Sequence, residues 1–141
     1  MINTVLDAFE ITLDRYPDAP AFEDENSALT FRDLYTGSQV IASRLAAALP
    51  PRTPVLVYMP KSPEMIRAFL GVLYAGCYYI PADTDMPAER LSHIIGTSGA
   101  KAVICSRSVS LPLICSRTAG YTMPKIWPMQ NRDRRALAFF P

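Results

Sequence analysis

The chain has 141 residues, of which 50% are hydrophobic and 19% charged, and its formal net charge is +1. This length and balance predict one globular domain and disfavour nucleic acid or a membrane as a partner. No apolar run approaches the roughly 18 residues that span a bilayer, and the first ten residues lack the basic cluster of a signal peptide. Three cysteines without CxxC spacing and a single histidine predict reduced thiols, a cytoplasmic protein and no metal site.

The first thirty residues predict a helix followed by a hairpin. Thr4 and Asp7 have capping-box spacing, and Pro17 closes the helix. Residues 21–23 and 28–30 flank a polar turn, which is typical of two short antiparallel strands. The apolar face of the helix is expected to consist of Val5, Leu6, Phe9 and Leu13.

A second helix follows the hairpin directly. Thr30 is the expected N-cap, with Asp33 three residues later, and Pro50 and Pro51 stop the helix. Its apolar positions are Phe31, Leu34, Ile41, Leu45 and Leu49. The segment LTFRDL, residues 29–34, is therefore interpreted as a strand end plus a helix cap, with no chemistry required of its Thr or Asp.

Residues 54–104 predict three strands separated by two helices. The strands are expected at 54–58, 78–80 and 101–104, as short apolar runs suited to burial on both faces. Helices are expected near 63–75, with Ser62 as N-cap and Gly76 as stop, and near 87–98. Short connections between parallel strands imply right-handed crossovers, so the fold class is α/β, with part of a doubly wound parallel sheet.

Regular patterning is not recognisable after Cys105. Residues 1–105 carry twelve acids and eight bases, whereas residues 106–141 carry one acid and six bases. Apolar residues in the second segment follow neither the strand period nor the helix period for long. Two interpretations stay open for this basic tail: a long irregular connection, or sequence not native to the fold, such as an out-of-frame extension.

Two segments resemble the core motifs of one enzyme family. VLYAGCYYIPAD, residues 72–83, is similar to the second core motif of the adenylate-forming (AMP-binding) synthetases, and LTFRDL is similar to their first. The sequence at residues 50–58, 62–65 and 87–91 is most similar to amino-acid adenylation domains and to ligases that load D-alanine onto D-alanyl carrier protein. The resemblance covers about residues 9–104. It therefore implies that residues 1–105 are the N-terminal part of an adenylation core domain, with residues 106–141 unassigned.

The resemblance also implies a reaction, but it places no catalytic residue in this chain. Members of the family activate a carboxylic acid with ATP and Mg²⁺, then pass the acyl group to a thiol on the phosphopantetheine arm of a carrier protein or on CoA. The phosphate loop, the adenine and ribose residues and the catalytic lysine of the family find no match here. We therefore assign no catalytic, cofactor-binding or metal-binding residue.

Two glycine-containing segments imitate phosphate loops. Residues 71–76 have the G-x-x-x-x-G spacing, but Cys77 and Tyr78 follow where Lys and Ser or Thr are needed. Residues 96–101 follow a helix and precede a strand, which is the reverse of the polarity that an anion site requires. No binding role is therefore expected for Lys101.

The remaining candidate side chains receive structural interpretations. His93 has no evident nucleophile as a partner, and Cys77 precedes a buried strand. Aromatic side chains at Tyr78, Tyr79 and Trp127 could stack a base but are usually part of a core. Asp83 is expected to hold a loop N–H group or to cap the next helix.

The sequence thus predicts a fragment of an ATP-dependent ligase that activates an amino acid, with D-alanine as one candidate, and loads a carrier-protein thiol. The chain alone is expected to be inactive. The alternative is a stand-alone α/β interaction module whose basic tail is the contact surface. A dinucleotide-binding enzyme is disfavoured, because residues 58–62 contain no glycine where G-x-G-x-x-G would be needed.

Overall fold

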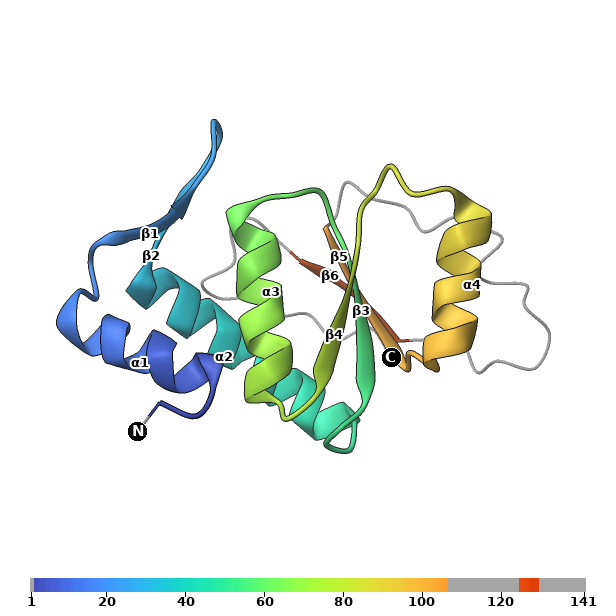
Figure 1. Ribbon diagram of the computed structural model, residues 1–141, viewed down its shortest axis with the longest axis horizontal. Coiled ribbons are helices and arrows are strands. Elements are labelled where there is room, and N and C mark those ends of the chain that lie inside the picture. The colour runs from blue at the N-terminus through green and yellow to red at the C-terminus, as the bar shows by residue number, and fades with distance from the viewer. Residues whose placement is uncertain (1, 107–124, 130–141) are drawn as a thin grey trace.

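A computed structural model describes residues 2–106 and 125–129 (Figure 1). Two sheets and four helices are present in this part of the chain. In chain order the elements are α1 Val5–Arg15, β1 Pro20–Glu23, β2 Ala28–Thr30, α2 Phe31–Ala48, β3 Pro54–Tyr58, α3 Pro63–Tyr74, β4 Tyr78–Ala82, α4 Ala88–Ser98, β5 Ala102–Ser106 and β6 Lys125–Met129. None of the helices in the described ranges is long and apolar enough to cross a membrane.

The N-terminal unit forms as the sequence predicts. Thr4 and Asp7 make a reciprocal capping box at the start of α1. β1 and β2 pair antiparallel, and the Asp24 carboxylate closes their turn by accepting from the backbone N–H groups of Asn26 and Ser27 at 2.8 and 2.7 Å. These local hydrogen bonds explain why a two-stranded hairpin persists beside the larger sheet.

The larger sheet is parallel throughout, in the order β4-β3-β5-β6. Its central strand β3 alternates between two cores. Val55 and Val57 face α2 and α3, whereas Leu56 and Tyr58 face α4. Because α3 and α4 cover opposite faces, the expected doubly wound arrangement is confirmed.

Two expectations are corrected by the structure. Val5 is 61% exposed and does not join the core, although Leu6 and Phe9 pack against it. Regular structure was expected to end at Cys105, yet residues 125–129 form β6 in register with β5. The rest of the basic tail lies outside the described residues.

Candidate functional site

The carboxyl edge of the parallel sheet is the place where this topology offers a site. The chain leaves β3 for β4 on one side and leaves β5 for β6 on the other. In open α/β sheets, ligands bind outside the carboxyl ends of strands at such a switch point. Tyr58, the last residue of β3, pairs in register with Cys105, the last but one residue of β5.

The hydroxyl groups of Ser62, in the β3–α3 loop, and of Tyr58, at the end of β3, are used by the fold. The Ser62 hydroxyl accepts from the Met65 N–H at 3.4 Å, which caps α3, and donates to the Pro60 carbonyl at 3.2 Å. The Tyr58 hydroxyl donates to the Thr84 carbonyl at 3.3 Å and ties this loop to the one after β4. These contacts fix the shape of the edge without presenting a nucleophile.

Cys105 is buried at the same edge. Burial raises the pKa of its thiol, which disfavours the reactive thiolate. Lys61 is an exposed cation of the neighbouring loop. The edge therefore carries a thiol that is held in its unreactive form.

The first glycine segment is a helix end, as expected. Gly71 lies inside α3, where a Cβ atom would come within 2.6 Å of the Ile41 Cβ atom in α2. Gly76 has φ +71°, the left-handed conformation of a residue that follows a helix. Close helix packing and helix termination therefore explain both glycines.

The second glycine segment connects α4 to β5. Gly99 ends the helix at φ +65°, and the Lys101 N–H donates to the Pro54 carbonyl at 3.0 Å. The segment thus runs from helix to strand, whereas an anion site needs the free N–H groups of a helix start.

The other candidates do not converge on one place. His93 contacts Thr97 on the exposed side of α4. Cys77 directly precedes β4 and is buried in the core with Val55 and Val57. The Asp83 carboxylate accepts from the Asp85 N–H at 3.4 Å, so it holds a loop N–H group, as expected. Trp127 lies in β6, and its side chain is outside the described residues.

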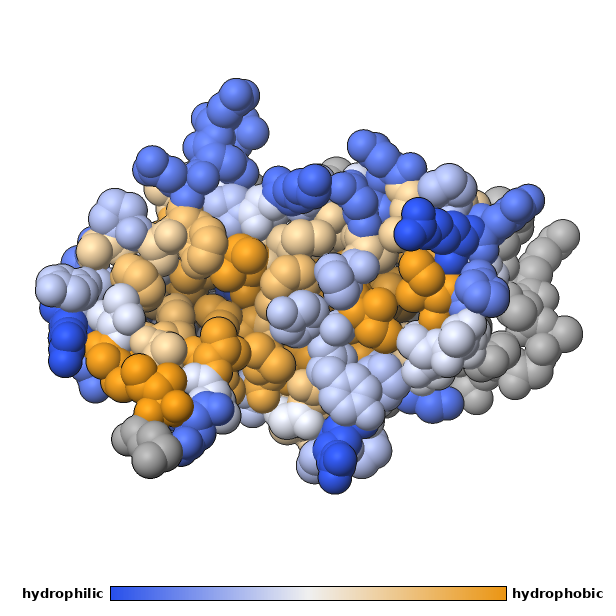
Figure 2. Space-filling view, viewed as in Figure 1, coloured by the Kyte–Doolittle hydropathy of each residue, from blue (hydrophilic) through white to orange (hydrophobic). Residues whose placement is uncertain are grey.

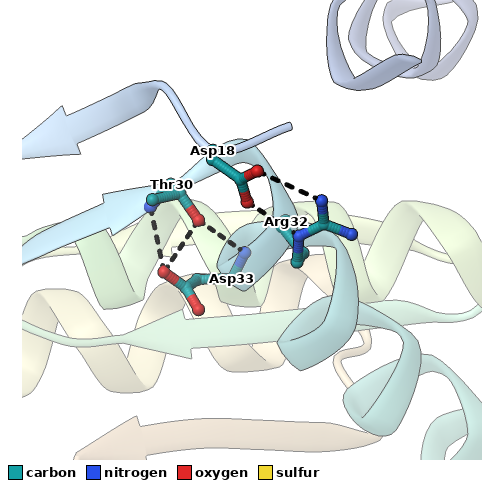
Figure 3. A network of polar contacts seen from close by, with 4 residues as sticks. All are labelled: Asp18, Thr30, Arg32 and Asp33. Atoms are coloured by element: carbon teal, nitrogen blue, oxygen red, sulfur yellow. Dashed lines mark hydrogen bonds and ion pairs between the residues drawn. The ribbon is translucent and has the colours of Figure 1, made fainter. Parts of the chain in front are cut away.

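Figure 3 shows the first core motif as a structural joint. The Thr30 hydroxyl accepts from the Asp33 N–H at 3.1 Å, and the Asp33 carboxylate accepts from the Thr30 N–H at 3.2 Å. Next to them, Arg32 donates to Asp18 at 2.9 Å and lowers the pKa of that exposed carboxyl group. The motif caps α2 and links it to the segment that precedes β1.

Sequence reasoning missed one pair of charged residues. Glu64 and Arg67 form an ion pair of 2.9 Å on α3, with side chains only 18% and 19% exposed. Burial raises the pKa of Glu64, and Arg67 partly opposes that shift. Arg67 crosses α2 at Gly37, where a Cβ atom would collide with its side chain. The i,i+3 spacing was a signal for the ion pair, but its burial was not visible in the sequence.

The groups that were considered as candidates for binding phosphate have structural roles in the described residues. Ser62 is committed to its cap, and both glycine segments are helix ends. No group of three or more potential metal ligands occurs within residues 2–106 and 125–129. Neither ATP nor Mg²⁺ is therefore assigned to this part of the chain.

Comparison with known proteins agrees with this arrangement. The family model of AMP-binding enzymes matches residues 9–134. The D-alanine--D-alanyl carrier protein ligase of Bacillus velezensis is 41% identical over 102 residues, which are 71% of this chain and 20% of that enzyme. The corresponding ligase of Bacillus cereus (strain G9842) is 38% identical over 96 residues, 67% of this chain and 19% of the ligase.

The solved structures show the same relationship. A nonribosomal peptide synthetase, FmoA3, in its form bound to alpha-methyl-L-serine-AMP, superposes with a TM-score of 0.73 at 25% identity. The superposition covers 86% of this chain and 13% of that one. The chain spans about a fifth of the length of the curated relatives that it matches. Sequence, fold and both core motifs agree: the chain belongs to the AMP-binding enzyme family.

Proposed function

We propose that this chain is the N-terminal scaffold of an ATP-dependent ligase that activates D-alanine as an aminoacyl-adenylate and loads it onto a carrier-protein thiol. The observation that carries the proposal is the 41% identity to a D-alanine--D-alanyl carrier protein ligase over 102 residues. In this proposal residues 1–105 are the N-terminal part of the adenylation core. The enzyme would use ATP and Mg²⁺ in the cytoplasm, with a phosphopantetheine-bearing carrier protein as partner.

The geometry supports a scaffolding role for the described residues. The Thr and Asp side chains of the two core motifs have partners within the fold: Thr30 with Asp33, and Asp83 with the Asp85 N–H. Stabilising the charge that develops on a transferred nucleotide requires preorganised donors or cations. In the proposal those groups are supplied by parts of the enzyme outside this chain, and β3, β4 and β5 hold the sheet edge on which they assemble.

A chimera tests this proposal. Residues 9–104 would replace the matched stretch of the Bacillus velezensis ligase, and ATP–pyrophosphate exchange would be measured with D-alanine, L-alanine and no amino acid. We expect D-alanine-dependent exchange by the chimera and none by the isolated 141-residue chain. A control chimera carrying Val57→Asp, which places a charge in the buried core, should lose both fold and exchange.

Two results would contradict the proposal. One is a chimera that is folded by circular dichroism and gel filtration yet inactive with every amino acid. The other is exchange by the isolated chain that survives removal of contaminating synthetases.

A further inference from the structure

The amino edge of the parallel sheet, where β3, β4 and β5 begin, has positively charged turns. The turns before these strands are residues 49–53, 75–77 and 99–101, and they contain Arg52 and Lys101 but no Asp or Glu. Because β3 pairs with both β4 and β5, the three turns lie side by side. Figure 1 shows the turns before β3 and β4 together at the lower end of the view, and Figure 2 shows strongly hydrophilic side chains projecting there.

Arg52 has a backbone conformation that disfavours any side chain. Its φ is +63°, and among the described residues no other non-glycine residue has a positive φ. This left-handed region favours glycine, because a Cβ atom is crowded there. The Arg52 N–H donates to the Gly76 carbonyl at 2.7 Å, so the neighbouring turn holds this conformation in place. An arginine here is less favourable for folding than a glycine, and such strain is concentrated at functional residues.

The turns are fixed to one another, whereas their charged groups are free. The Thr53 hydroxyl donates to the Pro50 carbonyl at 2.6 Å, and the Lys101 N–H donates to the Pro54 carbonyl at 3.0 Å. The side chains of Arg52 and Lys101 are exposed, and neither makes an ion pair or hydrogen bond with another described residue. None of the helices that end at this edge has a basic residue in its last turn, so the two cations are not helix caps.

A small anion such as phosphate fits this edge poorly. Sites for such anions are built from converging free N–H groups. The N–H groups of Arg52 and Lys101 both donate to carbonyl groups of the fold and are not available. An extended acidic segment fits better, because its alternate carboxylates are about 7 Å apart and the turns precede strands about 5 Å apart.

We propose that the amino edge of the sheet is a contact surface for an acidic, extended segment of another protein. Arg52 is the anchor, since its planar guanidinium group can bind a carboxylate through two hydrogen bonds, and Lys101 is the second contact. This surface lies opposite the carboxyl edge, where Asp83 and Asp85 follow β4. It is therefore separate from the edge at which the proposed ligase would assemble its reaction site, and the inference stands or falls independently of that function.

A single substitution tests the proposal, because it should weaken binding and stabilise the fold together. The probe is a labelled synthetic peptide of alternating glutamate and serine, and its binding to the 141-residue chain would be measured by fluorescence anisotropy at low salt. Arg52→Gly should weaken binding at least about fivefold, as expected for loss of one exposed charge contact. It should also raise the urea midpoint, because glycine relieves the backbone. Unfolding of the variant cannot produce this combination.

Arg90→Ala is the matched control. It removes an equal exposed charge from the first turns of α4, at the opposite edge of the sheet. Its binding of the peptide should stay within about twofold of wild type, since salt screens distant surface charges. Lys101→Ala should weaken binding, by less than Arg52→Gly. If the isolated chain aggregates, the same variants would be compared in the chimera.

Four results would overturn the inference. The first is a wild-type protein that does not bind the peptide. The second is equal binding by wild type and Arg52→Gly, or an equal loss in Arg90→Ala, which would make the effect one of net charge alone. The third is a lower urea midpoint for Arg52→Gly, which would remove the argument from strain. The fourth is displacement of the peptide by inorganic phosphate but not by chloride at equal ionic strength, which would identify a small-anion site.

Discussion

Substitution of Gly37 by alanine should destabilise the chain when residue 67 is arginine and stabilise it when residue 67 is alanine. Gly37 lies inside α2, where alanine normally stabilises a helix by about 1 kcal/mol. Here the added Cβ would meet the side chain of Arg67, including its Nε atom at 2.5 Å. The end of the Arg67 side chain must therefore move aside, which disturbs its ion pair with Glu64.

The structure allows both contributions to be estimated. Both side chains of the pair are less than a fifth exposed, so solvent screens the interaction only in part. Separating such a pair costs about 2–3 kcal/mol, since a largely buried carboxylate is left behind. Gly37→Ala should therefore destabilise the wild-type chain by about 1–2 kcal/mol. In an Arg67→Ala background the same substitution should stabilise it by about 0.5–1 kcal/mol.

Urea unfolding followed by circular dichroism would measure the four free energies of this cycle. Gly71→Ala is the matched control, because its Cβ atom would meet Ile41 at 2.6 Å whether or not Arg67 is present. It should destabilise both backgrounds. The reasoning is refuted if Gly37→Ala stabilises the chain equally with and without Arg67.

Three further predictions concern charge, attachment and the last strand. The pKa of Glu64 is raised mainly by burial above its usual 4.5, so its stabilising contribution is largest below that value and is lost as pH rises through the folded pKa. The stability of the wild-type chain relative to Glu64→Gln should therefore fall as the pH rises above 4.5, and a flat difference would reject the shift. Tyr74→Phe removes the 3.0 Å hydrogen bond to Glu10 that joins α3 to α1 and should cost about 0.5–1 kcal/mol in urea unfolding, whereas no change would mean that the bond contributes nothing. Amides of β6 should exchange slowly, like Val103 in β5; free exchange would contradict the strand and favour an out-of-frame tail.

The parallel layer could be predicted because its signals are local and agree with one another. The start of α3 is marked by Ser62 and Pro63, and its end by Gly76. Because short apolar runs lie on either side, α3 and its flanking strands could be predicted. The order of the strands was not predicted from the sequence. It depends on side chains from distant segments, such as Leu45 of α2, which packs in the core beneath β3.

Other features were missed for identifiable reasons. β6 contains Pro128, and proline within an apolar run argues against a strand, so residues 125–129 were not recognised. Val5 fits the apolar period of α1, but nothing in the described residues covers that position, and it remains exposed. The Glu64–Arg67 pair has a spacing that is common on helix surfaces, and the sequence does not show that Arg67 packs against α2 at Gly37.

Both glycine segments could be interpreted from the sequence because each follows a helix, whereas a phosphate loop precedes one. Residues 71–76 and 96–101 resemble phosphate loops in sequence, yet both lie at helix ends. Gly76 and Gly99 have the positive φ that is typical of a residue that ends a helix. The sequence indicated this because each segment follows a helical pattern. It could not show that the Ser62 hydroxyl would be occupied on both its donor and its acceptor sides.

The central claim is that the core motifs in this chain build a scaffold and carry no chemistry, and Thr30 tests it most directly. Thr30→Ala in the chimera removes one half of a capping box and should lower stability by about 1 kcal/mol. At a temperature where the variant is folded, its kcat for D-alanine-dependent exchange should stay within about twofold of the unsubstituted chimera. A drop in kcat of about tenfold or more with unchanged thermal stability would contradict the account and place Thr30 in the reaction.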